Sequence, residues 1–151
     1  MRYWLIMPVV IGLDQAVKVL VQSHLELNQS IPLIEHFLHI TYVRNPGGAF
    51  GLLVGQDLLF LIAALVVIMI SAGYVHKYRP GVGTQTALAL LAGGAAGNFI
   101  DRIWHGQVID FIDFGFWPVF NLADCAIVVG AVWLCWIFAG PEQTRGVNSW
   151  K

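Results

Sequence analysis

The sequence predicts an all-α membrane protein with four transmembrane helices and a small extracytoplasmic β element in its first loop. Of the 151 residues, 58% are hydrophobic and only 11% are charged, whereas a soluble domain usually carries about a quarter charged residues. The mean hydropathy is +0.71. In addition, four apolar segments reach the length of roughly 17 to 25 residues that a helix needs to cross a bilayer.

The predicted helices span residues 3–21, 58–75, 86–103 and 122–138. Helix-breaking residues separate them, with Pro80-Gly81 before the third helix and Pro118 before the fourth. The first segment follows a basic residue as a signal peptide does, but no small-x-small cleavage site follows, so we expect it to remain as a helix. No repeat or linker divides the chain, and residues 1–151 are predicted to form one domain.

Basic residues near the helix ends predict the orientation of the chain. If both termini share a side with the second loop, most of these residues fall on that side. They are Arg2, Lys77, Arg79, Arg145 and Lys151. We therefore expect both termini in the cytoplasm and the first and third loops outside.

The two outer loops carry distinct patterns. In the first loop Leu38, Ile40 and Tyr42 alternate with other residues at the period of a half-buried strand, and a glycine-rich stretch follows at 46–51. A small sheet on the outer membrane surface is therefore predicted. The third loop contains an aromatic set typical of a membrane interface. Its members are Phe111, Phe114, Phe116, Trp117 and Phe120.

The charged residues of the predicted helices and of the third loop, together with Asn98 and Asn121, all fall at the outer side of this arrangement. They are Asp14, Lys18, Asn98, Asp101, Arg102, Asp110, Asp113, Asn121 and Asp124. A charge inside a membrane costs on the order of 3 kcal/mol unless it is paired or solvated. One shared polar site explains this convergence.

Structural explanations exist for each residue taken alone. Asp14 and Lys18, at i and i+4, could be an ion pair that lets the first helix pack. Asp101 could belong to a helix end, and Asp124, three residues after Asn121, could cap the fourth helix. Several such coincidences on one membrane face are less economical than a single site.

Two carboxylates in a poorly hydrated site share a proton, because repulsion and desolvation raise the pKa of one of them. The ionised member can activate water while the protonated member polarises a carbonyl group, which is aspartic-protease chemistry. Asp110 and Asp124 suit these roles, since a loop and a helix start meeting at the interface can admit water. Asp113 is a rival for a place in the pair.

Other chemistries have weaker support. Glu35, His36, His39 and His105 could bind zinc, but no H-E-x-x-H helix is present. Cys125 adjoins Asp124 but should point elsewhere on the helix. The net charge of -1 provides no basic surface for nucleic acid. A proton-coupled transporter and an assembly factor that binds a partner helix remain alternative functions.

Five sequence blocks resemble those of lipoprotein signal peptidase, the bacterial signal peptidase II family. They run in order along nearly the whole chain, and together they are highly specific. The blocks are Asp14-x-x-x-Lys18, Asn45-Pro46-Gly47-Gly48-Ala49-Phe50-Gly51, Gly93-Gly94-Ala95-Ala96-Gly97-Asn98-Phe99-Ile100-Asp101-Arg102, Val108-Ile109-Asp110-Phe111 and Phe120-Asn121-Leu122-Ala123-Asp124.

This resemblance implies an aspartic endopeptidase of the bacterial inner membrane, acting near the extracytoplasmic face. It would cut diacylglyceryl-modified prolipoproteins just before the lipidated cysteine, with Asp110 and Asp124 as catalytic residues. The partners would be these substrates and membrane lipids, with a monomeric enzyme, no metal and no cofactor.

The resemblance also implies residues that bind substrate or support the catalytic pair. These are Asp14, Lys18, Asn45, Gly47, Asn98, Asp101, Arg102 and Asn121. One departure from the family pattern is the interval between Asp110 and Asp124, which is shorter than in some relatives and contains Asp113.

Overall fold

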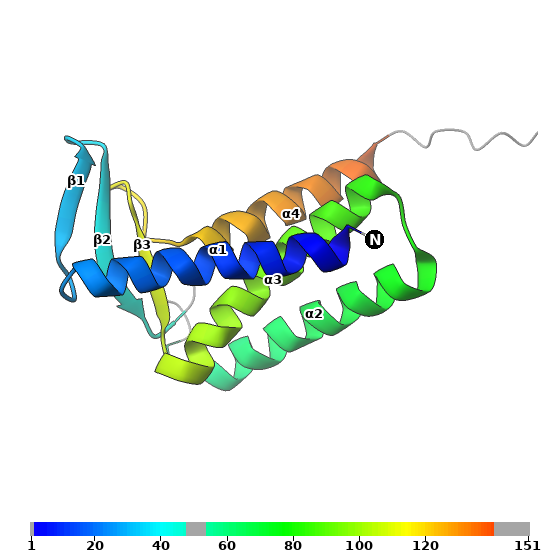
Figure 1. Ribbon diagram of the computed structural model, residues 1–151, viewed down its shortest axis with the longest axis horizontal. Coiled ribbons are helices and arrows are strands. Elements are labelled where there is room, and N and C mark those ends of the chain that lie inside the picture. Colours follow the sequence, from blue (N-terminus) through cyan, green and yellow to red (C-terminus); the bar gives the residue numbers. More distant parts are fainter. Residues whose placement is uncertain (1, 48–53, 141–151) are drawn as a thin grey trace, which may run out of the picture.

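The computed structural model describes residues 2–47 and 54–140. Four helices lie lengthwise beside one another, and a small sheet lies at one end of them, opposite the N-terminus (Figure 1). The helices are α1 (Tyr3–His24), α2 (Asp57–Tyr78), α3 (Val82–His105) and α4 (Leu122–Ala139), and the strands are β1 (Ser30–Ile34), β2 (Leu38–Asn45) and β3 (Val108–Asp113).

All four predicted helices are present, and each extends beyond its predicted apolar run. The longer ends have a physical reason, since a helix satisfies its backbone hydrogen bonds internally and can therefore continue into the polar residues beyond the apolar run. The glycine-rich stretch from residue 48 to 51 and the basic residues Arg145 and Lys151 lie outside the described residues.

Three of the four helices meet a length and hydropathy criterion for a membrane span. Within the described parts of the chain these are α1, α2 and α4. The less apolar α3 is the central helix and packs against the other three. It buries a row of small residues that includes Ala87, Ala92 and Gly97. Because α3 faces mainly protein, it needs less apolar surface than a helix that faces lipid.

The small residues of α3 let neighbouring backbones approach closely. A Cβ atom added at Gly93 would lie 2.8 Å from Cβ of Val10 on α1, and one added at Gly94 would overlap the carbonyl oxygen of Ala123 on α4. This is the close packing expected of a small-xxx-small stripe. It fixes α1 and α4 against the end of α3 that carries the polar residues.

The sheet is antiparallel, with strand order β1-β2-β3. The predicted strand is β2, but placing the whole sheet in the first loop was wrong, because β3 comes from the loop between α3 and α4. The sequence of β3 does not alternate between apolar and polar residues. In the structure Val108 to Phe111 are all buried, so no face of this segment is exposed at regular intervals. Its pairing partner is also distant in sequence, so no local pattern marked it.

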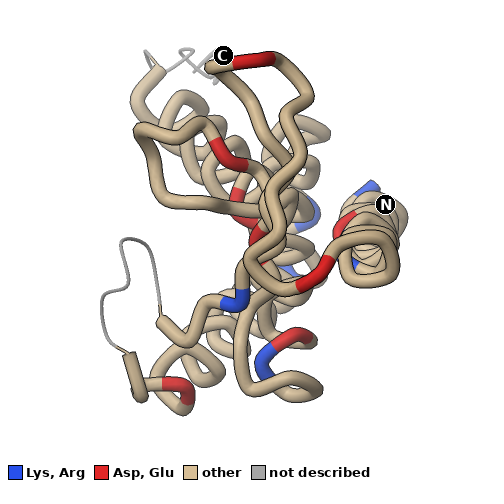
Figure 2. The backbone as a smooth tube through the Cα atoms, turned by 90° about the vertical axis from the view of Figure 1, so that its left-hand side faces the viewer, with Lys and Arg blue, Asp and Glu red and all other residues tan. Residues whose placement is uncertain are grey.

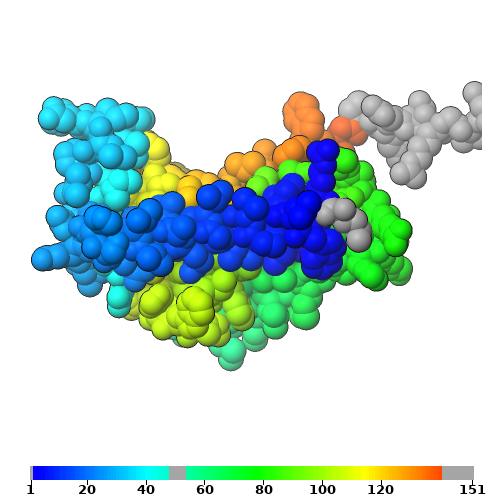
Figure 3. Space-filling view, in the orientation of Figure 1, coloured from blue at the N-terminus to red at the C-terminus, as the bar shows by residue number. Residues whose placement is uncertain are grey.

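Aromatic residues of the third loop are divided between a core and the surface. Phe111 is buried with Val21, Tyr42 and Ile109 in a cluster that joins the end of α1 to the sheet. Phe111 therefore packs against protein, and its ring is not available to contact lipid. The exposed Phe116 matches the predicted interfacial position better. Figure 3 shows the β1–β2 hairpin projecting past the helices, with a concave surface between it and α4.

The end of the molecule opposite the sheet has a different kind of core. There Tyr3 of α1 and Ser71 of α2 are buried, and their hydroxyl groups are hydrogen-bonded at 2.9 Å. This polar pair carries no charge. Buried charged side chains of the described residues instead lie toward the sheet end, where α1, α3 and α4 meet β3.

Candidate active site

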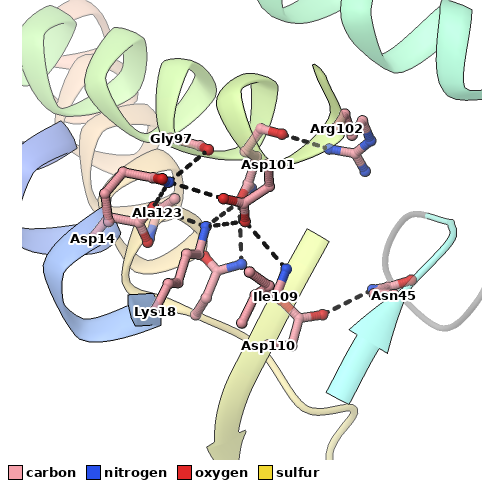
Figure 4. Close-up of polar contacts among 12 residues, drawn as sticks. Asp14, Lys18, Asn45, Gly97, Asp101, Arg102, Ile109, Asp110 and Ala123 are labelled. Atoms are coloured by element: carbon pink, nitrogen blue, oxygen red, sulfur yellow. Dashed lines mark hydrogen bonds and ion pairs between the residues drawn. The ribbon is translucent and has the colours of Figure 1, made fainter. Parts of the chain in front are cut away.

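The predicted site residues form one connected network of hydrogen bonds and ion pairs at the sheet end. Figure 2 views the molecule from the sheet end and shows acidic positions on several separate segments. The close-up in Figure 4 shows the contacts around Asp14, Lys18 and Asp101 and the bond between Asn45 and Asp110. The members are Asp14, Lys18, Asn45, Gly47, Asn98, Asp101, Arg102, Asp110, Asn121 and Asp124.

Lys18 lies at the buried centre of this network. Its Nζ atom is 2.8 Å from Oδ2 of Asp14 and 2.7 Å from Oδ2 of Asp101. It also donates to Oδ1 of Asn98 at 3.2 Å. The ion pair that the spacing of Asp14 and Lys18 suggested is therefore present, and Asp101 is a second anionic partner. Paired charges of this kind are the form in which buried carboxylates are tolerated.

The two carboxylates bound to Lys18 also hold backbone groups beside the candidate catalytic residues. Asp14 accepts a hydrogen bond from the backbone N–H of Ala123 at 2.9 Å, and Ala123 directly precedes Asp124. Asp101 accepts one from the backbone N–H of Ile109 at 3.1 Å, directly before Asp110. The group of Asp14, Lys18 and Asp101, here called the charged triad, thus links α1, α3, β3 and α4 (Figure 4).

Asp110 lies on β3 and is 2% exposed. Asn45 donates to its Oδ2 atom at 2.9 Å, and Asn121 donates to its Oδ1 atom at 2.7 Å. Burial and the nearby charge of Asp124 outweigh these two hydrogen bonds and raise the pKa of Asp110 to about 7. At neutral pH this carboxyl group is therefore partly protonated.

Asp124 is the third residue of α4 and forms a capping box with Asn121. The Asn121 side chain accepts from the backbone N–H of Asp124 at 2.9 Å, and Asp124 accepts from the backbone N–H of Asn121 at 3.3 Å. The prediction that Asp124 takes part in capping α4 is therefore confirmed. It is incomplete, because the other carboxylate oxygen of Asp124 accepts from Asn98 at 2.7 Å.

Neutral amides connect the charged triad to the pair Asp110 and Asp124. The side-chain amide of Asn121 donates to Oδ1 of Asn98 at 3.1 Å and to Asp110 at 2.7 Å. Asn98 in turn contacts both Lys18 and Asp124. Asparagine suits this position because its amide group donates and accepts at once without adding charge.

Arg102 lies on the other side of the network, toward β2. Its guanidinium group donates to the carbonyl oxygen of Gly47 at 3.0 Å and lies 4.5 Å from the centre of the Phe60 ring. The backbone N–H of Gly47 donates to the Asn45 side chain at 2.9 Å. These contacts tie the end of β2 to α3 and to α2.

The ten residues form two sets, according to whether they line a cavity of about 970 Å³. Among the described residues, its lining includes Asn45, Gly47, Asn98, Arg102, Asp110 and Asp124. The charged triad and Asn121 are buried behind these residues, with exposed fractions of 0 to 1%. The first set can contact a bound molecule, and the second set can act only through its neighbours.

Sequence reasoning missed one member of the network and misplaced another residue. The side-chain amide of Gln15 lies 2.9 Å from Oδ1 of Asp101 and 3.2 Å from the carbonyl oxygen of Gly97, and so supports the charged triad. Its position next to Asp14, as another polar residue inside a membrane helix, was the available signal. Cys125 was expected to point away, but it also lines the cavity.

The proposed zinc alternative has no geometric support in the described residues. These contain no group of three or more His, Cys, Asp or Glu side chains arranged to hold a metal. His36 lies in the turn between β1 and β2 with a positive φ of 62°, and His39 lies on β2. The two histidines therefore lie on different elements of the hairpin.

Solved structures define the class of protein. One, described as a bacterial membrane enzyme determined by the in meso method at 2.3 Å resolution, aligns with a TM-score of 0.89 and 31% identity over 99% of this chain and 94% of that one. Another, at 1.9 Å resolution, gives 0.81 and 34% over 95% and 94%. The fold is that of a membrane enzyme.

Sequence comparisons define the family. The family model for signal peptidase (SPase) II matches residues 6–139. The lipoprotein signal peptidase of Moorella thermoacetica is 43% identical over 97% of this chain and 98% of its own. That of Halothermothrix orenii is 45% identical over 87% and 90%. The chain belongs to the signal peptidase II family of membrane peptidases.

Proposed function

We propose that the chain is an aspartyl endopeptidase that removes signal peptides from diacylglyceryl-modified prolipoproteins, cutting on the N-terminal side of the lipidated cysteine. Asp110 and Asp124 would carry the reaction without a metal or a cofactor. The observation that carries this proposal is that both carboxyl groups line one cavity, while the pKa of Asp110 is raised to about 7. A carboxyl group with this pKa can act as a general acid near neutral pH, while the second carboxyl group of the pair acts as the base.

In the proposed reaction, Asp124 removes a proton from a water molecule, which attacks the carbonyl carbon of the scissile peptide bond. Asp110 donates its proton to the carbonyl oxygen. Both Asn45 and Asn121 donate hydrogen bonds to Asp110, so neither neighbour consumes the proton that Asp110 carries. Collapse of the tetrahedral intermediate then breaks the C–N bond. The proton taken by Asp124 passes to the leaving amine, and one hydroxyl group of the intermediate returns its proton to Asp110, which restores both carboxyl groups.

The residues around the pair would divide into two roles. Asn45, Gly47, Asn98 and Arg102 line the cavity and would bind or orient the peptide. Arg102 suits this role because a guanidinium group has five donors, more than its contacts with Gly47 and Asn98 use. The charged triad and Asn121 would hold the catalytic pair from behind.

The cavity also supports a lipid-modified substrate. Its lining continues along α4 to Val128 and Val129, whose side chains are 60% and 52% exposed on the surface of an apolar helix. In a bilayer that surface faces lipid, so a substrate anchored by acyl chains could enter sideways from the membrane.

The arrangement in the membrane follows from the same proposal. We place all four helices, α3 included, across the bacterial inner membrane in a monomeric, single-domain enzyme that contacts membrane lipids directly. Both termini would be cytoplasmic, which puts the sheet and the cavity at the extracytoplasmic face. The basic residues Arg2, Lys77 and Arg79 belong to the end of the helices away from the sheet, in keeping with this orientation.

The test compares two precursor peptides that differ only in whether the cysteine carries a diacylglyceryl group. Purified protein should cleave the modified peptide alone, with or without a chelator. Asp110→Asn and Asp124→Asn should each lower kcat by about 10³-fold, within the range for loss of a general acid or base, whereas Asp113→Asn should not. Full activity in either variant would refute the pair, cleavage of the unmodified peptide would refute the substrate, and loss with chelator would indicate a metal.

A further inference from the structure

The segment 114–119, here called the rim loop, connects β3 to α4 and forms one wall of the cavity. Trp117, Pro118 and Val119 are among the lining residues. The base of the rim loop is closed by backbone hydrogen bonds between Ile112 and Phe120, with N–O distances of 2.8 and 3.1 Å. Its shape therefore depends on what holds the residues between these two positions.

Asp113 anchors the rim loop through hydrogen bonds to both of its carboxylate oxygens. Oδ1 accepts from the backbone N–H of Gly115 at 2.7 Å, inside the rim loop. Oδ2 accepts from the hydroxyl group of Thr41 on β2, also at 2.7 Å. Because the Thr41 hydroxyl donates to Asp113, the hydroxyl of Ser30 on β1, 2.8 Å away, donates to Thr41. A polar chain thus crosses all three strands and ends on the rim loop.

An aromatic contact holds the rim loop at a second point. The ring of Phe114 lies 5.3 Å from that of Phe37, in the turn between β1 and β2, and 5.9 Å from that of Phe120. Gly115 follows with a φ of 74°, a left-handed conformation that favours glycine. The position of the cavity wall is therefore coupled to the β1–β2 hairpin.

We propose that Asp113 is a positioning residue that fixes the rim loop and thereby sets the affinity for the peptide substrate. A wall already held in its binding shape loses less conformational entropy when the peptide binds. Asp113 itself is not among the described residues that line the cavity, and its two oxygens are engaged by Gly115 and Thr41. The affinity part of this inference rests on the proposed function, whereas the anchoring part does not.

The kinetic test compares Asp113→Ala with Asp113→Asn. Asparagine can still accept from Gly115 and can donate to the Thr41 hydroxyl, whereas alanine can do neither. For the alanine variant we expect kcat to be unchanged and KM to rise by about tenfold, equivalent to a loss of about 1.4 kcal/mol. Asp113→Asn should resemble the wild type, and Thr41→Val should give a smaller rise in KM.

Glu35→Ala is the matched control, since it removes an exposed carboxylate from the turn of the same hairpin. It should change neither KM nor kcat. If Asp113→Ala leaves KM at the control value, the role in affinity is refuted. If Asp113→Asn and Asp113→Ala both abolish kcat, Asp113 is a catalytic residue and the positioning role is wrong.

Hydrogen exchange tests the anchoring without any substrate. The backbone amide of Gly115 should exchange faster in Asp113→Ala than in the wild type, and should remain protected in Asp113→Asn and Glu35→Ala. Equal exchange in all four proteins would refute the anchoring. If the wild type cleaves neither precursor peptide, the proposed function and the affinity part fall together, while the exchange result still decides whether Asp113 anchors the rim loop.

Discussion

Two buried carboxylates at the sheet end, Asp101 of the charged triad and Asp110 of the pair that lines the cavity, differ in their partners rather than in their burial. In the charged triad, Asp101 is 1% exposed and is paired with the ammonium group of Lys18 at 2.7 Å. In the pair that lines the cavity, Asp110 is 2% exposed, but the groups bonded to it are the neutral amides of Asn45 and Asn121. Burial alone therefore cannot tell the two aspartates apart.

The difference teaches how one polar network can contain both fixed and reactive acids. An ammonium partner at contact distance favours the charged form of a carboxylate. A buried carboxylate whose hydrogen-bond donors are amides can keep a raised pKa, as Asp110 does at about 7. Asn98 and Asn121 lie between the charged triad and the pair that lines the cavity, and connect them through hydrogen bonds. Neither side chain carries a charge.

The largest expected effect on stability comes from removing the ammonium group of Lys18. Lys18→Met leaves the carboxylates of Asp14 and Asp101 buried without their counterion, and breaking a buried ion pair in this way costs about 3 to 5 kcal/mol. We expect a large fall in thermal stability and in the yield of folded protein, measured by thermal unfolding in detergent. Activity should be lost along with the fold.

Lys77→Met is the matched control, since Lys77 is exposed near the end of α2 away from the sheet. It removes the same charge from the same type of side chain and should leave unfolding nearly unchanged. Equal stability of the two variants would contradict the central place given to Lys18.

A substitution that moves the charged triad without removing charge should have an intermediate effect. A Cβ atom at Gly97 would lie 2.5 Å from Oδ2 of Asp14 and 3.2 Å from Cβ of Ala123. Gly97→Ala should therefore displace Asp14 from the backbone N–H that precedes Asp124, and overpacking of this kind costs about 1 to 3 kcal/mol. We expect lower kcat together with lower stability, measured by peptide cleavage and thermal unfolding.

Gly73→Ala on α2 is the control for this change, because a Cβ atom there meets nothing within 4 Å. Alanine is the better helix former by about 0.5 to 1 kcal/mol, so this variant should be as stable as the wild type or more so. If Gly97→Ala behaves like Gly73→Ala, the close contact with Asp14 does not limit the site.

Much of this architecture was predictable because a segment that crosses a membrane must be apolar and long enough to span the bilayer. Apolar runs and their breakers predicted the four helices, and the cost of buried charge predicted that polar residues converge at one end. The ion pair of Asp14 with Lys18 followed from helical spacing alone. These signals are local, or follow from the direction of successive helices, and so can be derived from one sequence.

The rest depends on contacts between distant segments. β3 was missed because its partner, β2, lies more than sixty residues earlier along the chain. Asp101 and Asp110 could not be ranked from the residues, because only the three-dimensional arrangement gives one an ammonium partner and the other two amides. The resemblance to the signal peptidase II family assigned them different roles in advance, and those roles remain predictions, while the contacts show that the surroundings of the two aspartates differ.

The smallest expected effect comes from removing the side chain of Asn45, one of the two amides that donate to Asp110. If Asp110 acts as the acid, kcat/KM of the wild type should fall as pH rises through about 7, because the raised pKa of Asp110 makes that the range in which it loses its proton. The hydrogen bond from Asn45 favours the ionised form and lowers this pKa. In Asn45→Ala the pKa should rise, so the alkaline limb of the profile should move to higher pH while the acid limb stays in place. An alkaline limb that moves to lower pH, or does not move, would show that Asp110 is not the acid.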